Sequence, residues 1–218
     1  MINFKEFISE ENKEPHFCAF DLDGVLGHTD DSKLRIHVMD ANNNKVKTLT
    51  NTEFNTHSLP EGHKYDFSEF KSSDTFAQHT KPIKAMINKL NDLHNQKHRV
   101  EIITARSDLD DQKKFAHHMQ KMGIDINQIH VRRTGNLNRS NPAKAKKDTI
   151  KELLTNTQHK KAHLYDDSHD NLDAFLSLHK HFPETEFHAH HVKYDPKKDK
   201  VTITTKKTSK QENRGRND

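Results

Sequence analysis

Short apolar runs alternate with amphipathic segments along most of this chain. The apolar runs predict strands at 17–20, 100–104, 129–131, 162–165 and 187–192. The segments between them carry apolar residues at helical intervals and predict helices over about 82–93, 110–122, 142–154 and 170–180. Regular alternation of strand and helix is typical of a parallel sheet with helices on both of its faces. The pattern therefore predicts an α/β domain.

A long segment, from Val25 to about Thr80, interrupts this alternation after the first strand. Residues 34–39 and 45–49 flank a run of three asparagines, which predicts a β-hairpin. The residues after the hairpin predict an irregular segment whose aromatic side chains are Phe54, Tyr65, Phe67 and Phe70. Because the insertion is too long for a simple loop, we expect a small cap over the end of the sheet.

The two ends of the chain differ from the middle. The apolar residues near the start have rough helical spacing, so residues 1–16 are expected to form an N-terminal helical segment. Residues 194–218 are polar and basic with almost no apolar anchor, which predicts a mobile tail. The expected α/β domain then spans residues 17–193, with the cap at about 25–80.

Composition limits the class of protein. Of the 218 residues only 30% are hydrophobic, and the mean hydropathy of -1.08 implies that some segments lie outside the core. A net charge of +4 and a pI near 9.0 permit binding to a polyanion without requiring it. The single cysteine, Cys18, excludes an internal disulfide and fits a reducing compartment. The chain has neither a membrane-spanning apolar run nor a signal-peptide pattern, so we expect a cytoplasmic location.

Two carboxylates follow the first predicted strand. Asp21 and Asp23 stand where the apolar run stops, and Gly24 follows them. Side chains two residues apart share a face of an extended strand, so both carboxylates can approach one phosphoryl group or one cation. Taken alone, this sequence is equally typical of an ordinary turn, because Asp and Gly are common turn residues. The polar residues at the other strand ends decide between the two interpretations.

Polar residues also mark the other strand ends. Thr104, Ala105 and Arg106 end the second strand, a lysine-rich helix precedes the fourth, and Asp166 and Asp167 end the fourth. The carboxyl ends of parallel strands meet at one edge of a sheet, where ligands bind. Each group alone could be an ordinary strand end, a solvated helix face or a helix cap. Together they would have to reach one edge by accident, so a functional site is the better hypothesis.

This order of motifs resembles that of the haloacid dehalogenase (HAD) superfamily of phosphohydrolases, over roughly residues 17–192. The resemblance implies a HAD-type, Rossmann-like parallel sheet with a small cap inserted after the first strand. It also implies that Asp21 is a nucleophile that forms an aspartyl-phosphate, and that Asp23 protonates the leaving group and then activates water. Because position 23 holds Asp rather than Thr or a non-acid, the resemblance favours a phosphatase over an ATPase or a dehalogenase.

The resemblance assigns the remaining motifs in the same way. Thr104 would hold a phosphoryl oxygen, and a helical lysine, Lys147 or else Lys144, would neutralise charge there. Lys147 has the spacing before the acidic pair that polynucleotide phosphatases show, whereas Lys144 is closer to the start of its helix. The expected ligands of Mg²⁺, a hard cation that prefers oxygen, are the side chains of Asp21, Asp166 and Asp167 and the backbone carbonyl of Asp23.

The expected substrate is a nucleic-acid end. Arg106 two residues past the threonine, the adjacent acidic pair and the modest cap resemble the 3′-phosphatase domain of polynucleotide kinase-phosphatases and phage-type RNA-repair phosphatases. Arg106 is expected beside the scissile phosphate. The chain has no Gly-x-x-x-x-Gly-Lys-Ser/Thr sequence, so no kinase activity is expected. The other residues expected to contact substrate are Ala105, Arg132, Arg133 and Arg139.

Other interpretations stay open. A phosphatase of small nucleotides or sugar phosphates would use the aromatic residues of the cap to enclose its substrate. A nucleic-acid-binding protein without catalysis could have the same fold, although every expected catalytic position is filled. A phosphoacceptor receiver domain has its acidic pair before its acceptor Asp, which is the opposite of the order here. His188 and His190 would share a strand face, but without Cys or a third spaced ligand they do not indicate a zinc site.

Overall fold

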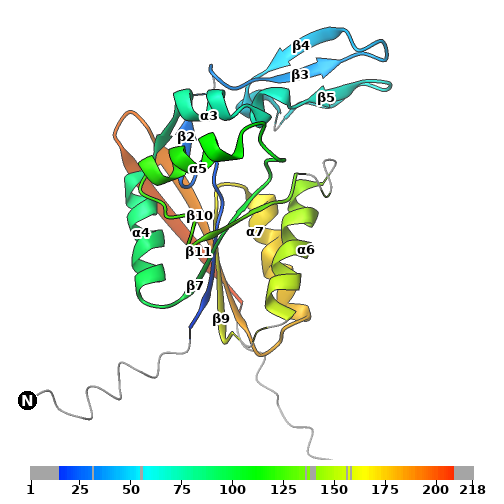
Figure 1. The fold of residues 1–218 in the computed structure, drawn as a ribbon. Coiled ribbons are helices and arrows are strands. Elements are labelled where there is room, and N and C mark those ends of the chain that lie inside the picture. Colours follow the sequence, from blue (N-terminus) through cyan, green and yellow to red (C-terminus); the bar gives the residue numbers. More distant parts are fainter. Residues whose placement is uncertain are drawn as a thin grey trace, which may run out of the picture.

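A six-stranded sheet forms the centre of the protein. The computed structural model describes residues 15–208, apart from residues 31, 55, 136, 138–140, 156 and 158. The strands cross the sheet in the order β11, β10, β9, β1, β7 and β8 (Figure 1). Their bounds are β1 Phe17–Phe20, β7 Arg99–Thr104, β8 His130–Arg133, β9 Lys161–Asp166, β10 Glu186–Asp195 and β11 Lys200–Lys207. Neighbouring strands are parallel except β10 and β11, which confirms an α/β fold with a mostly parallel sheet.

Helices cover both faces of this sheet. The helices α4 and α5 lie on one side, and α6 and α7 lie on the other (Figure 1). Their bounds are α4 Lys84–Asn95, α5 Gln112–Lys121, α6 Pro142–Thr155 and α7 His169–Leu176, which continues into the 3-10 turn η2 Ser177–Lys180. Pro82, expected in the first helical turn, instead ends a short strand, and α4 begins two residues later.

The central strand β1 is buried on both faces, which is why its sequence is apolar throughout. Cys18 and Phe20 face the core under α4 and α5, whereas Phe17 and Ala19 face the core under α6 and α7. All four residues are 0% exposed. Burial of a large apolar side chain stabilises a fold by about 1.5–3 kcal/mol, so this strand anchors two cores at once. An ionised carboxylate is costly in such a strand, and the first acid, Asp21, comes where the strand ends.

The insertion after β1 forms a separate sheet above the carboxyl end of the main sheet (Figure 1). β3 (Ile36–Met39) pairs with β4 (Lys45–Leu49), which confirms the expected hairpin. The segment expected to be irregular contains a third strand, β5 (Lys64–Asp66), which pairs with the other edge of β3. The insertion also contains α2 Asn51–Phe54, the 3-10 turn η1 Ser68–Lys71 and α3 Ser73–His79.

This cap has a small core of its own. Ile36, Val38 and Leu49 are buried, and the aromatic residues that pack against them are Phe54, Tyr65, Phe67 and Phe70. The rings of Phe54 and Tyr65 meet edge to face, with centroids 4.9 Å apart. A two-stranded ribbon of β2 (Gly27–Thr29) and β6 (Thr80–Pro82) connects the cap to the main sheet. The cap therefore packs as a unit at the end of the sheet where the polar residues lie.

The carboxyl-terminal segment differs from the expected mobile tail. Part of residues 194–218 returns as β11, which pairs with β10 from Lys207 opposite His188 to Lys200 opposite Asp195. Most side chains of β11 are exposed, and Val201 packs against the main core. Backbone hydrogen bonds rather than apolar side chains hold such an edge strand, so its polar sequence gives little sign of it. The expected helix within residues 1–16 and the last ten residues lie outside the described residues, except that Pro15 and His16 are not helical.

Stacked histidines lie on the face of the sheet that α4 covers. His163 of β9 stacks on His188 and His190 of β10, with ring centroids 4.7 and 5.3 Å away. His16 stacks on His163 at 5.2 Å and on His98 at 4.6 Å. Burial, and then the neighbouring histidines, lowers the pKa of His163 to about 2 and that of His190 to about 4. Both rings are therefore neutral in the folded protein at pH 7.

We expect the free energy of unfolding to fall when the pH is lowered from 7 to 5. An unfolded histidine takes up a proton near pH 6.5, whereas folded His163 and His190 resist protonation until the pH reaches their lowered pKa values. Stability that is present above pH 6.5 is therefore lost below it. The pair should account for about 1–3 kcal/mol at pH 5, allowing for partial exposure, and urea unfolding at both pH values measures the change.

Substitutions separate this effect from the titration of other groups. His163→Phe combined with His190→Phe keeps stacked rings but removes both protonation sites, so it should reduce the pH dependence. His117→Gln, at an exposed position of α5, should leave the pH dependence unchanged. The same pH dependence in the parent and in the double variant would contradict the interpretation.

Candidate active site

Acidic residues from two neighbouring strand ends meet at the carboxyl edge of the sheet. Asp21 follows β1, and Asp166 ends β9, which is parallel to β1. The N–H of Asp21 donates to the carbonyl of Tyr165 at 2.9 Å, so the strand pairing continues to the point where the carboxylates emerge. One carboxylate oxygen from each of Asp21, Asp166 and Asp167 lies within 4.8 Å of the other two. The structure therefore brings these three expected residues together as one acidic cluster.

The chain turns sharply directly after Asp21. The carbonyl of Leu22 accepts from the N–H groups of Leu26 and Gly27 at 3.0 and 2.9 Å. Gly24, inside this turn, has a φ of +74°, in the left-handed region that favours glycine. A Cβ at this position would collide with the carboxylate of Asp167. Glycine is therefore required for the backbone conformation and for the close approach to the acidic cluster.

A buried lysine lies between the acids. Lys146 of α6 is 1% exposed, and its Nζ donates to Oδ2 of Asp166 at 2.7 Å. The same Nζ lies 3.1 Å from Oδ1 of Asp21. Burial alone would lower the pKa of Lys146, but Asp166 and Asp21 outweigh burial and hold the pKa above its usual value. Lys146 is therefore a protonated, fixed counter-charge to two carboxylates.

The expectation that Lys147 or Lys144 fills this role is wrong. Lys147 reaches a serine hydroxyl at 3.5 Å, and Lys144 pairs at 2.6 Å with an exposed aspartate of its own helix. The spacing to the acidic pair misled the assignment, whereas the periodicity of the helix identifies the correct residue. Lys146 precedes the buried Ile150 by four residues and the buried Leu154 by eight, so it lies on the apolar face of α6.

Several N–H donors hold the carboxylate of Asp166. Its Oδ1 accepts from the backbone N–H of Ser168 and from the side-chain amide of Asn171, both at 2.9 Å, and Lys146 donates to Oδ2. Asp166 is 0% exposed, so its orientation is fixed by these bonds. Asn171 is not among the residues expected at this site from the sequence. The signal for it is weak: Ser168 caps α7, and Asn171 is the residue whose N–H that cap accepts.

The site carries an excess of negative charge. Burial raises the pKa of Asp21 well above its usual value, and the neighbouring carboxylates add to the rise although Lys146 opposes it. Asp167 is accessible from outside, yet loss of hydration and then the adjacent Asp166 raise its pKa to about 7. A divalent cation would offset this charge, and carboxylate oxygens suit a hard cation. The acidic cluster can therefore hold a metal ion.

Asp23 and Arg106 form a bidentate ion pair. The Nε and Nη2 atoms of Arg106 donate to Oδ2 and Oδ1 of Asp23 at 2.8 and 2.7 Å. From the sequence, Arg106 is expected beside the scissile phosphate, where it would use the same two donors. In the structure these two donors bind Asp23 instead, and Arg106 is 4% exposed. This arginine therefore holds the second acid of the site.

The end of β7 is fixed by the chain that follows β8. Thr104 is 1% exposed, and its hydroxyl accepts from the N–H of Arg106 at 3.2 Å. The N–H and the hydroxyl of Thr134 both donate to the carbonyl of Thr104, at 2.8 and 3.1 Å. Gly135 lies so close that a Cβ there would collide with the carbonyl of Ala105, whose own side chain is exposed. These contacts hold Thr104 at the same sheet edge as Asp21.

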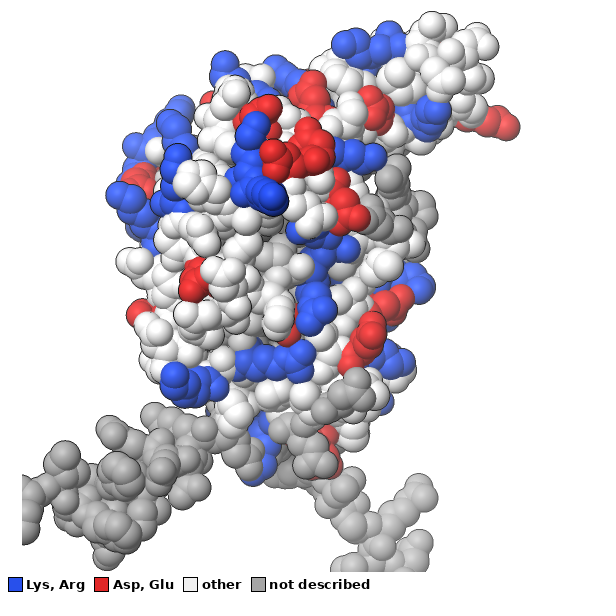
Figure 2. Space-filling view, in the orientation of Figure 1, with Lys and Arg blue, Asp and Glu red and all other residues white. Residues whose placement is uncertain are grey.

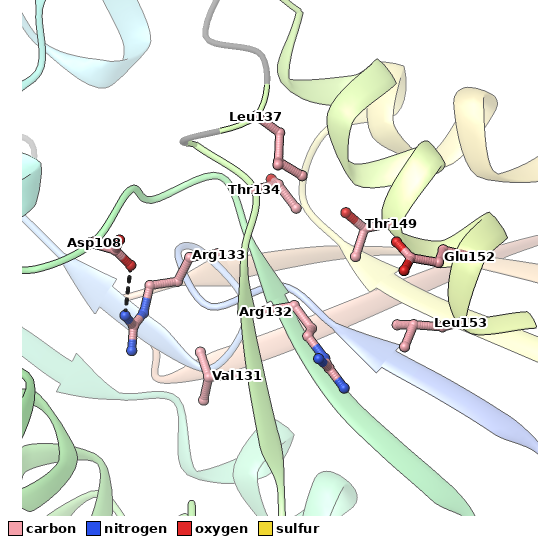
Figure 3. A pocket seen from close by; sticks show the side chains of 9 residues that line it. All are labelled: Asp108, Val131, Arg132, Arg133, Thr134, Leu137, Thr149, Glu152 and Leu153. Atoms are coloured by element: carbon pink, nitrogen blue, oxygen red, sulfur yellow. Dashed lines mark hydrogen bonds and ion pairs between the residues drawn. The ribbon is translucent and has the colours of Figure 1, made fainter.

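A pocket of about 340 Å³ lies beside this loop, between β8 and α6 (Figure 3). Arg132 and Arg133, expected to contact nucleic acid, both line it. Each is already paired, because Arg132 donates to Glu101 at 3.1 Å and Arg133 donates to Asp108 at 3.0 Å. The third expected arginine, Arg139, lies outside the described residues.

No protein-family model and no curated protein matches this chain. Within the part of the chain that the structure describes, none of the helices has the length and apolar character needed to cross a membrane. A functional assignment therefore depends on the geometry of the site.

Gly24→Ala should weaken metal binding at the acidic cluster, because the new methyl group displaces Asp167. We expect the affinity for Mg²⁺ to fall by at least about tenfold, measured as the Mg²⁺-dependent rise in the thermal unfolding midpoint. Gly62→Ala is a matched control, since Gly62 has a φ of +72° but nothing within 4 Å of a Cβ. An equal response of both variants to Mg²⁺ would contradict binding of a cation at the acidic cluster.

Lys146→Met should destabilise the fold by about 3 kcal/mol or more at pH 7, because it leaves two buried carboxylates without their counter-charge. Lys147→Met and Lys144→Met, in the same helix, should each change stability by less than about 0.5 kcal/mol. Urea unfolding of the three variants measures the difference. A larger loss in the Lys147 variant than in the Lys146 variant would return the role to Lys147.

Proposed function

We propose that this protein is a Mg²⁺-dependent phosphomonoesterase of the HAD type that acts through an aspartyl-phosphate on Asp21. The observation that carries the proposal is the grouping of Asp21 with a buried lysine and an acidic pair at the end of the central strand. In open α/β sheets this edge is where ligands bind. The position of β1 between β7 and β9 and the cap inserted after β1 support the same assignment.

Asp21 and Asp23, the two acids that follow β1, have separate roles in this proposal. A carboxylate oxygen of Asp21 attacks phosphorus, and the bond from phosphorus to the leaving oxygen breaks with its electron pair. Asp23, carrying a proton on an oxygen lone pair that Arg106 does not use, gives it to that oxygen, so that the leaving group departs as an alcohol and Asp23 is left as the carboxylate that Arg106 holds. In the second step Asp23 takes a proton from water as the water oxygen attacks phosphorus. That attack breaks the bond to Asp21 and releases inorganic phosphate.

Fixed positive charge supports both steps. The protonated amine of Lys146 is held against Asp21, where negative charge builds up on the phosphoryl oxygens. The hydroxyl of Thr104, at the same sheet edge, is a further donor for a phosphoryl oxygen. Mg²⁺ held by the acidic cluster would supply positive charge to the phosphoryl group.

Asp21→Asn should reduce Mg²⁺-dependent hydrolysis of p-nitrophenyl phosphate to below about one thousandth of the parent rate, because the amide is nearly isosteric but cannot attack phosphorus. Asp148→Asn, at an exposed position of α6, is the matched control and should keep the parent rate. Substantial activity in the Asp21 variant would remove the mechanism. A nucleic-acid-binding protein without catalysis would show no hydrolysis in the parent either.

The proposed substrate is a nucleic-acid 3′ end, and a small nucleotide or sugar phosphate is the second candidate. Support for nucleic acid comes from Arg132 and Arg133, which line the pocket beside the site. A column of basic side chains on the face of the molecule seen in Figure 2 adds to it. Support for a small substrate comes from the acids already paired with both arginines. Figure 2 also shows acidic side chains above the column, and the loop after Arg106 carries three exposed aspartates, Asp108, Asp110 and Asp111.

Arg132→Gln combined with Arg133→Gln should raise KM for a 3′-phosphorylated oligonucleotide by about tenfold and reduce the salt dependence of KM, because fewer counterions are released on binding. Hydrolysis of p-nitrophenyl phosphate should not change. Lys160→Gln combined with Lys161→Gln removes two charges at the opposite end of β9 and should have neither effect. Parent-like oligonucleotide kinetics in the arginine variant would make the small substrate the better candidate.

A further inference from the structure

Arg106 links the second acid of the site to the cap. Its side chain is 2% exposed and holds Asp23 through Nε and Nη2, at 2.8 and 2.7 Å. The remaining nitrogen, Nη1, donates to the backbone carbonyl of Phe70 at 3.1 Å. A guanidinium can make these contacts at the same time because its N–H donors form a rigid, planar fork. One side chain therefore bonds to the main domain and to the insertion.

Two aromatic rings lie beside the same guanidinium. Its central carbon is 5.5 Å from the ring centroid of Phe70 and 4.9 Å from that of Phe76. Phe70, in η1, packs against the cap core, whereas Phe76, in α3, belongs to the main core under α4 and α5. Cation–π attraction holds an arginine against such rings. Arg106 thus contacts both cores at the point where the cap meets the sheet.

The loop that carries Arg106 is tied to the same part of the cap. The N–H of Asp110 donates to the carbonyl of Lys71 at 3.0 Å, and the carboxylate of Asp110 accepts from the N–H of Ser73 at 2.8 Å. Phe70, Lys71 and Ser73 all lie at the junction of η1 and α3. A displacement of this junction would therefore carry the guanidinium with it or break its contacts.

We propose that Arg106 is a positioning residue that makes the orientation of Asp23 depend on the seating of the cap. The inference rests on the proposed hydrolase function, in which Asp23 protonates the leaving oxygen. While Phe70 holds the guanidinium, the guanidinium holds both carboxylate oxygens of Asp23. Without the ring of Phe70 the guanidinium keeps its bond to the backbone carbonyl of residue 70 but loses one of its two aromatic neighbours, so its position, and with it the orientation of Asp23, is less fixed. The cap thereby assists proton transfer, most strongly where the leaving group needs a proton.

Two leaving groups distinguish this role from a purely structural one. p-Nitrophenolate departs without a proton, whereas a sugar hydroxyl needs one. Asp23→Asn should therefore lower kcat/KM for a nucleoside 3′-phosphate about 100-fold more than kcat/KM for p-nitrophenyl phosphate. Phe70→Ala, which changes a residue of the cap, should shift the ratio of the two rates in the same direction by about tenfold.

The matched control removes another ring of the same cap core. Phe54 contacts Tyr65 and Phe67 rather than Arg106, so Phe54→Ala should leave the ratio within about twofold of the parent value. In an Asp23→Asn background, Phe70→Ala should not change the ratio further, because the group that Arg106 positions is gone. Arg106→Lys keeps the charge but loses the planar pair of N–H donors, so it should give the same ratio of rates as Phe70→Ala. If Phe70→Ala does not fold, Arg106→Lys serves as the test in its place.

Equal losses on both substrates in Phe70→Ala and in Arg106→Lys would overturn the coupling. The coupling would also be overturned if the double variant Phe70→Ala, Asp23→Asn changed the ratio by the product of the two single effects. That result would show that the two residues act independently. Neither result would be confused with failure of the proposed function. That failure would appear as hydrolysis retained by Asp21→Asn or as a parent protein that hydrolyses neither substrate.

Discussion

The ion pair between Lys146 and two buried carboxylates is the interaction on which the site depends. Removal of a charge from water costs several kcal/mol unless an opposite charge lies close to it. Asp21 and Asp166 can occupy one buried edge because Lys146 lies 3.1 and 2.7 Å from their oxygens. The balance is incomplete, since Asp23 and Asp167 add two further carboxylates and Arg106 adds one cation. The same electrostatics that assemble the site therefore favour a divalent cation there.

The elements that bury the most apolar surface were the ones that could be predicted from the sequence. β1, β7 and β9 are covered on both faces, so their interiors are mostly apolar, interrupted only by Glu101 in β7 and His163 in β9, and the helices that cover them show a regular apolar face. β5 and β11 were missed because they lie in small or edge positions where backbone hydrogen bonds do most of the pairing. The pattern of apolar residues in a sequence reflects which side chains are buried, so a strand that buries few side chains cannot be recognised from it.

The residues of the site also divide into those that could be predicted from the sequence and those that could not. The acids could be predicted because strand ends of a parallel sheet meet at one edge, and Asp21, Thr104 and Asp166 all lie there. The lysine was misplaced by one residue because spacing to the acidic pair was used instead of the face of α6 on which the residue lies. The partner of Arg106 could not be predicted at all. A carboxylate and a phosphate offer the same geometry to a guanidinium, and the choice depends on where Asp23 lies after the turn.

Ionisable side chains also explain how a chain with 30% hydrophobic residues builds two cores. At the acidic cluster the buried Lys146 stays charged because carboxylates lie beside it, whereas on the α4 face of the sheet His163 and His190 stay neutral and stack as aromatic rings do. Nδ1 of His163 and Nε2 of His190 also share a hydrogen bond of 3.0 Å. Imidazole suits this position because its neutral form predominates at pH 7. At least five of the nineteen histidines therefore pack against other rings in place of apolar residues.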